Sequence, residues 1–173
     1  MKKKIINCLL LILVGISFLV FAVGSGTNVT TSTSGGSGST ADLATYKLND
    51  DIYVKGSTGE YRVKFTNIYE TKDRNEFSDK TAKKVIIIEY EYENISQEDD
   101  LYVDEMHFKL YDKENNQLET YPVSTKYGSS VSKGRKATAS EAYALNSDNN
   151  YIELEFYDNM FNNKPDCKVV FEW

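Results

Sequence analysis

The stretch VIIIEYEYEN at residues 85–94 decides the fold of this chain. Its even-numbered residues from Ile86 to Tyr92 are apolar or aromatic, while Glu89, Glu91 and Glu93 fall between them. This period of two is typical of a β-strand, in which successive side chains point to opposite faces. The stretch therefore predicts a strand with one face in a core and the other toward water.

The same alternation continues in both directions along the chain. It is clear at residues 61–66, 106–111, 152–157 and 167–173, and weaker at 52–55, 118–123 and 136–145. Strands with one apolar and one polar face are typical of antiparallel sheets with one face buried. No sustained 3.6-residue apolar pattern follows residue 24. We therefore predict an all-β, antiparallel two-sheet β-sandwich of about seven or eight strands at residues 46–173.

The pattern leaves the orientation of one strand undecided and predicts the burial of one cysteine. In the segment 136–145, either Ala142 and Ala144 or Tyr143 and Leu145 could face the core. The sequence alone does not decide which alternate residues point inward. Near the end of the chain, Cys167 alternates in phase with other apolar residues, which predicts a buried and unreactive thiol.

The N-terminus indicates where the protein is located. Three lysines at residues 2–4 precede an apolar run from Ile5 to Val23. As a helix of about 1.5 Å per residue, this run approaches the thickness of the hydrocarbon core of a bilayer. Lysines are retained on the cytoplasmic side, so residues 1–24 predict a signal peptide or membrane anchor that places the rest of the chain outside the cytoplasm.

Whether this segment is retained or cleaved stays open. The length of the run favours a retained hydrophobic helix. Ala22 and Gly24 are small residues of the kind that a signal peptidase recognises, which favours cleavage before Ser25 and release. The segment is also similar to a bacterial lipoprotein signal, but Ser25 occupies the position of the lipid-bearing cysteine. Residues 25–45, rich in Gly, Ser and Thr, predict a disordered linker.

Charge and cysteine content indicate which partners and cross-links to expect. The chain has a net charge of −6, and the part after residue 24, with 17 basic and 26 acidic side chains, has −9. An acidic domain repels a phosphate backbone, so we expect no nucleic-acid partner. Cys8 lies in the apolar run and Cys167 near the C-terminus, so we expect no disulfide in the exported domain.

Four segments together resemble an uncharacterised family of bacterial surface proteins. They are the strand and Asn-containing turn at 85–96, the strand and acidic turn at 108–115, the segment 131–145 around Lys133-Gly134, and the strand at 151–158. The family is a domain of unknown function, and the resemblance implies an immunoglobulin-like sandwich of the telokin-like, immunoprotective-antigen type. The chain departs from it at residues 113–115, which lack the expected Gly, and at Lys133, where Pro is usual. The family supplies no active-site residues.

The sequence does not predict an enzyme. His107, the sole histidine, falls on the outward phase of a predicted strand, and no nucleophile and base stand beside it in the pattern of a catalytic triad. A zinc site requires three or four His or Cys ligands, which the exported part does not have. No Gly-rich phosphate-binding loop is present, so we expect no catalytic residues and no bound cofactor.

Two kinds of binding site stay open. Glu98, Asp99, Asp100 and Asp104 gather in one predicted loop, and calcium prefers six to eight such oxygen ligands. Solvated loop acids are the alternative interpretation. The chain also has 13 tyrosines, a residue enriched at recognition surfaces and also favoured in strands. The tyrosines expected on polar phases or in loops are Tyr102, Tyr111, Tyr121, Tyr127 and Tyr157.

These features predict a non-catalytic domain, membrane-anchored or secreted, that binds a surface protein or glycan at the bacterial cell surface. The alternative is a structural or accessory envelope protein with a calcium site in its loops. A shared exposed patch of the five tyrosines would favour binding, whereas scattered tyrosines would weaken that interpretation.

Overall fold

The computed structural model describes residues 43–173, which form nine strands and one short 3₁₀ helix. The elements are β1 (Thr45–Lys47), β2 (Ile52–Lys55), β3 (Glu60–Thr71), β4 (Lys84–Asn94), η1 (Glu105–His107), β5 (Phe108–Tyr111), β6 (Glu119–Thr120), β7 (Lys136–Leu145), β8 (Tyr151–Phe156) and β9 (Cys167–Glu172). The predicted membrane segment and the linker up to residue 42 lie outside the described residues. Residues 43–173 contain no helix with the length and apolar character needed to cross a membrane.

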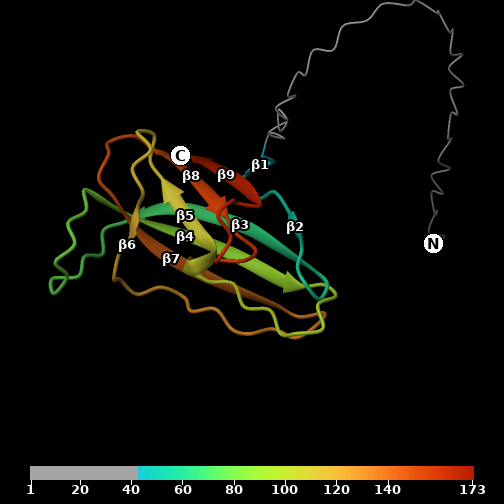
Figure 1. Ribbon diagram of the computed structural model, residues 1–173. Coiled ribbons are helices and arrows are strands. Elements are labelled where there is room, and N and C mark those ends of the chain that lie inside the picture. The colour runs from blue at the N-terminus through green and yellow to red at the C-terminus, as the bar shows by residue number, and fades with distance from the viewer. Residues whose placement is uncertain (1–42) are drawn as a thin grey trace, which may run out of the picture. The chain divides into compact units, whose positions relative to one another are not determined.

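Two sheets form the sandwich (Figure 1). The order of strands is β1-β9-β8-β5 in one sheet and β2-β3-β4-β7-β6 in the other. The predicted all-β two-sheet sandwich is confirmed, with nine strands rather than seven or eight. The expectation of purely antiparallel sheets is wrong at one position, because β1 pairs with β9 in parallel. This three-residue strand starts at the last residue of the expected linker and is too short to show alternation.

Aromatic side chains join the two sheets in the core. The ring of Phe65 on β3 lies 6.0 Å from that of Tyr90 on β4. Across the sandwich it lies 5.5 Å from Phe108 on β5 and 5.7 Å from Phe171 on β9, both in edge-to-face geometry. The predicted inward phases of β3, β4, β8 and β9 are confirmed, including the buried Cys167.

β4 is buried on both faces along its first half, which single-face alternation does not predict. Val85 and Ile87 pack on the outer face with Tyr121, Ala142 and Ala144 in a second apolar cluster. The same cluster explains why the phase of β7 was ambiguous. Tyr143 and Leu145 point into the main core, whereas Ala142 and Ala144, which alternate with them, are buried in the outer cluster.

The segment around His107 differs from the predicted strand. Residues 105–107 form η1, and strand β5 begins only at Phe108. Asp104 caps this helix, since its carboxylate accepts a hydrogen bond from the Met106 backbone N–H at 3.1 Å. Met106, expected in the core, is exposed as a result, and His107 is half-buried instead of projecting from a strand. Asp at the N-cap followed by a helical turn is the local signal that outweighed alternation.

The turn at residues 112–116 forms without the glycine that the resemblance led us to expect. Asn115 adopts a positive φ of 63°, a conformation that Asn tolerates better than most residues. The Asp112 carboxylate accepts hydrogen bonds from the backbone N–H groups of Glu114 and Asn116 at 3.0 and 2.8 Å. These side-chain contacts stabilise the turn in place of a glycine.

Glu141 is the one charged residue on the inward face of β7. It lies between the core residues Ala139 and Tyr143, and its carboxylate accepts a long hydrogen bond from the Tyr90 hydroxyl at 3.4 Å. Burial, together with the nearby Glu105 carboxylate, raises the pKa of Glu141 to about 7. The ionised form of this side chain is therefore destabilised in the fold.

The Glu141→Gln substitution is expected to change how stability depends on pH. An acid whose pKa is raised by folding destabilises the folded state as the pH rises from about 4.5 to about 7, and the whole penalty is present above that range. Since Glu141 is partly exposed, we expect the variant to be more stable by about 1–2 kcal/mol at pH 8, with no difference near pH 4.5. Urea unfolding of residues 40–173 measures this.

Glu172→Gln, at an exposed position on β9, is the matched control and should change stability little at any pH. A stabilisation by Glu141→Gln that is the same at pH 4.5 and pH 8 would contradict the explanation.

Candidate functional site

Three connecting segments meet at one end of the sandwich around a hollow of about 340 Å³. They are the β2–β3 turn, the segment between β4 and η1, and the β8–β9 loop. We call it the loop-end hollow, and its lining residues are Gly56, Ser57, Tyr61, Gln97, Asp100, Leu101, Tyr102, His107 and residues 158–161. It combines aromatic walls with amide, carboxylate and hydroxyl groups, as small-ligand sites commonly do.

The floor of the loop-end hollow is fixed by Tyr61. Its ring is buried, with the centroid 6.5 Å from that of Phe156, and its hydroxyl donates to the Asp158 carboxylate at 2.6 Å. Burial and the neighbouring carboxylate both raise the pKa of the Tyr61 hydroxyl. The hydroxyl therefore stays protonated, and it holds the start of the β8–β9 loop against the core.

His107 forms the side of the hollow nearest η1. Its Nδ1 lies 3.0 Å from the Asp104 carboxylate, and its ring stacks on Phe156 with centroids 6.4 Å apart. Both contacts orient the imidazole, so His107 has a structural role here. The edge of the His107 ring that lines the hollow is therefore held in a fixed orientation.

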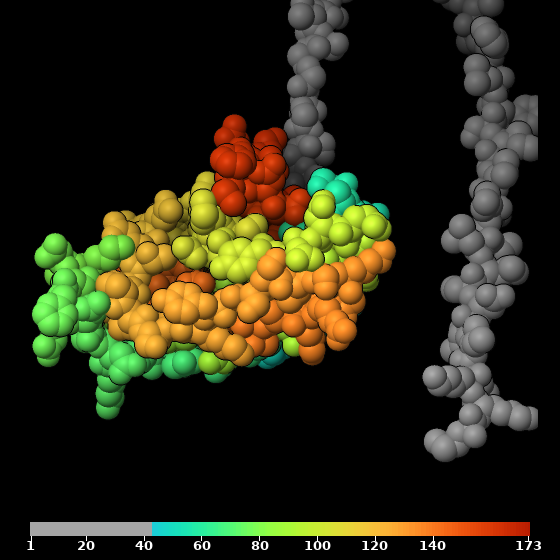
Figure 2. Space-filling view, turned by 90° about the horizontal axis from the view of Figure 1, so that it is seen from below, coloured from blue at the N-terminus to red at the C-terminus, as the bar shows by residue number. Residues whose placement is uncertain are grey.

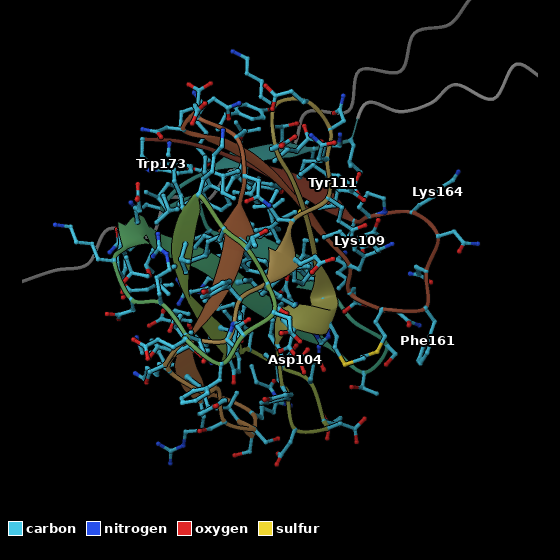
Figure 3. The ribbon with its side chains drawn as sticks, turned by 90° about the vertical axis from the view of Figure 1, so that its left-hand side faces the viewer. Asp104, Lys109, Tyr111, Phe161, Lys164 and Trp173 are labelled. Carbon is cyan, nitrogen blue, oxygen red and sulfur yellow. The ribbon has the colours of Figure 1, made fainter. Side chains whose placement is uncertain are left out.

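Apolar side chains at the rim remain exposed to solvent. Phe161 is 86% exposed at the tip of the β8–β9 loop, which projects from the body of the domain in Figure 3. Tyr102 is 45% exposed and, like Phe161, lines the hollow. Phe161 was not predicted as a site residue. The sequence nevertheless contains a signal for it. Met160 and Phe161 are adjacent apolar residues in an Asn-rich loop, where no strand alternation accounts for them.

The four calcium candidates do not converge. Glu98 pairs with Lys133 at 3.2 Å, Asp104 caps η1, and only Asp100 lines the loop-end hollow. Within residues 43–173, no group of three or more His, Cys, Asp or Glu side chains is arranged to hold a metal ion. A calcium site in this loop stays a prediction.

The five candidate tyrosines do not form one patch. Tyr102 and Tyr127 are exposed on neighbouring segments, since a Cβ added at Gly128 would lie 3.4 Å from the Tyr102 ring. Tyr111 is half-buried on the outer face of β5. Tyr121 and Tyr157, both expected to be accessible, are buried.

The two buried tyrosines have clear packing reasons. Tyr121 belongs to the outer apolar cluster of β4 and β7. Tyr157 donates its hydroxyl to Glu155 at 2.7 Å, and the Lys109 ammonium lies 4.4 Å from its ring centroid. Neither side chain offers surface to a partner. Cys167, likewise buried, has its thiol pKa raised to about 12 by burial and by Asp166, so the thiol is protonated near neutral pH.

Residues 37–158 match the family described as Domain of unknown function (DUF5067). The chain belongs to this family. The fold is similar to that of MPT63, a secreted protein from Mycobacterium tuberculosis, with a TM-score of 0.58 and 10% identity over 77% of this chain and 99% of that one. It is also similar to the yjhA protein from Bacillus subtilis, with a TM-score of 0.52 and 18% identity over 73% and 98% of the two chains. No curated protein sequence matches.

Removing the hydroxyl of Tyr61 is expected to weaken the floor of the loop-end hollow. Tyr61→Phe keeps the ring contact with Phe156 and deletes only the hydrogen bond to Asp158, which costs about 1.5–3 kcal/mol for a bond to a charged acceptor. Urea unfolding should show this loss, and hydrogen exchange should become faster in residues 157–166.

Tyr53→Phe removes a hydroxyl from an exposed side chain on β2 and serves as the control. Equal stability of the Tyr61 and Tyr53 variants would show that the Asp158 contact does not hold the loop.

Proposed function

We propose that this protein is a non-catalytic binding module at the bacterial cell surface, and that the loop-end hollow contacts its partner. The module is an immunoglobulin-like sandwich held outside the cytoplasm, either anchored through residues 1–24 or released after cleavage. Its partner is a surface protein or a wall glycan.

The observation that carries this proposal is the exposed apolar rim of the loop-end hollow. Aromatic side chains such as Phe161 and Tyr102 are enriched where proteins bind partners, and here they border a concave site. Gln97, Asp100 and other polar groups of the hollow supply hydrogen-bond donors and acceptors. An aromatic surface beside such groups suits a sugar ring or a polypeptide.

Two arguments support a location outside the cytoplasm. Lysines followed by an apolar run and a Gly/Ser/Thr-rich segment are typical of exported, tethered domains. In addition, one structure with a similar fold is described as a secreted protein. The absence of a second cysteine after residue 24 is compatible with export, because the domain is stabilised by its aromatic core and requires no disulfide.

Retention of cell-envelope material on immobilised residues 40–173 tests the proposal. Isolated wall glycan and solubilised surface proteins are applied separately, so that the two classes of partner are distinguished. Phe161→Ser should weaken retention about thirtyfold, equivalent to about 2 kcal/mol for a central contact. Phe161 is exposed, so the substitution should leave the fold intact.

Phe77→Ser is the matched control, because Phe77 is 95% exposed on the loop between β3 and β4 and does not line the hollow. Retention that both variants reduce equally, or that neither reduces, would contradict the proposed site. A rise in melting temperature with millimolar calcium, without retention of envelope material, would instead support the structural or accessory role.

A further inference from the structure

A second concave site lies on the open side of the sandwich, between β5 with the preceding helix η1 and the strands β6 and β7 of the other sheet. Two adjoining cavities of about 470 and 250 Å³ share Lys80, Glu105 and Thr120 in their walls. We call them together the side cleft. It shares no lining residue with the loop-end hollow. In Figure 2 a hollow is visible on this side, bordered by atoms coloured as residues near 120, with deeper orange atoms inside.

Two carboxylates that form no ion pair within the described residues face the side cleft. Glu141 and Glu105 both line it, and the carboxylates of Glu105 and Asp104 act electrostatically on Glu141. The ion pairs formed within residues 43–173 do not include Glu105 or Glu141. The nearest cation in the wall, Lys80, donates to the Thr120 carbonyl at 2.7 Å and lies 3.5 Å from Glu119.

A buried hydroxyl in the same cleft has no partner. Tyr143 is only 3% exposed and lines the larger cavity, and its hydroxyl makes no hydrogen bond. Tyr143 and Glu141 are two residues apart on β7 and so share its inward face. Burial and the carboxylates of Glu141 and Glu105 raise the pKa of this hydroxyl, which therefore stays protonated. An unsatisfied buried polar group costs about 1–3 kcal/mol unless something binds to it, so a ligand that donates a hydrogen bond there has a physical reason to bind.

Part of the wall is apolar. Phe108, Leu110 and Leu118 line the larger cavity, together with the polar side chains of Gln117, Glu119 and Thr120. Calcium prefers six to eight oxygen ligands, and the side cleft does not assemble three acidic side chains for a metal. Apolar walls that end at two carboxylates and a hydroxyl instead match an alkyl chain with a cationic end.

We propose that the side cleft binds a primary alkylammonium group, with its alkyl part against Phe108, Leu110 and Leu118 and its N–H donors toward Glu141, Glu105 and the Tyr143 hydroxyl. The group comes from a lysine side chain of another protein or from a small free amine. Both sources present the same chemistry to the cleft.

Binding should depend on pH through Glu141. The groups that face its carboxylate are the Tyr90 hydroxyl on β4, Tyr143 on β7, Glu105 and Asp104 at η1, and Lys80 at the rim. Because the pKa of Glu141 is raised to about 7, its ionised fraction increases about tenfold between pH 6 and pH 8. The affinity for an alkylammonium ion should increase by about the same factor over this range.

Calorimetric titration of the full-length chain in non-ionic detergent micelles tests the proposal. The probes are n-butylammonium chloride, its neutral counterpart n-butanol, and the peptide acetyl-Ala-Lys-Ala-amide with and without acetylation of the lysine amine. We expect n-butylammonium to bind at least tenfold more tightly than n-butanol. Tighter binding of the lysine peptide than of n-butylammonium assigns the source to a protein, and the reverse order assigns it to a free amine.

Three variants make the result specific to the side cleft. Glu141→Gln, which we expect to fold at least as stably as the natural chain, should weaken n-butylammonium binding at least tenfold at pH 8. Tyr143→Phe should weaken it three- to tenfold, while Glu172→Gln on β9 should leave it unchanged. Unchanged binding in Glu141→Gln, equal binding of butanol, or a preference for calcium chloride over the amine would overturn the proposal.

Discussion

The contact between Phe65 and the aromatic rings of the opposite sheet is the interaction on which the structure depends. Phe65 lies in the five-stranded sheet and meets Phe108 and Phe171 of the four-stranded sheet edge to face, at 5.5 and 5.7 Å. Such rings bury large areas and prefer this geometry. The described residues contain no disulfide, and their single cysteine is free and buried, so these contacts and the apolar side chains around them hold the sheets together.

The loop-end hollow is built outward from this cluster. Phe108 lies beside Phe156, and Phe156 in turn contacts both Tyr61 and His107. Tyr61 then fixes Asp158 and the start of the β8–β9 loop. The exposed Phe161 therefore stands on a loop whose base is anchored in the core. In the proposed binding role, a loop held in this way loses less conformational entropy on binding than a free loop would.

The alternation of β4 and its neighbours was enough to predict the sandwich, because period two is unambiguous where one face is buried. It could not predict the second apolar cluster, since the burial of Ile87 depends on the approach of Tyr121 from a distant segment. The site was harder to predict. Tyr102 was among the candidates proposed from composition, but the sequence does not indicate which loops share an end of the sandwich. Glu141 was missed because the alanines beside it hid the phase of β7.

A double-mutant cycle between Phe65 and Phe171 tests most directly whether aromatic contacts between the sheets hold the domain together. Phe65→Leu, Phe171→Leu and the double variant of residues 40–173 are compared by urea unfolding. We expect the effects not to be additive, with a coupling free energy of about 0.5–1.5 kcal/mol. Additivity within about 0.3 kcal/mol would contradict a coupling between the sheets, because the two rings would then stabilise their own sheets independently.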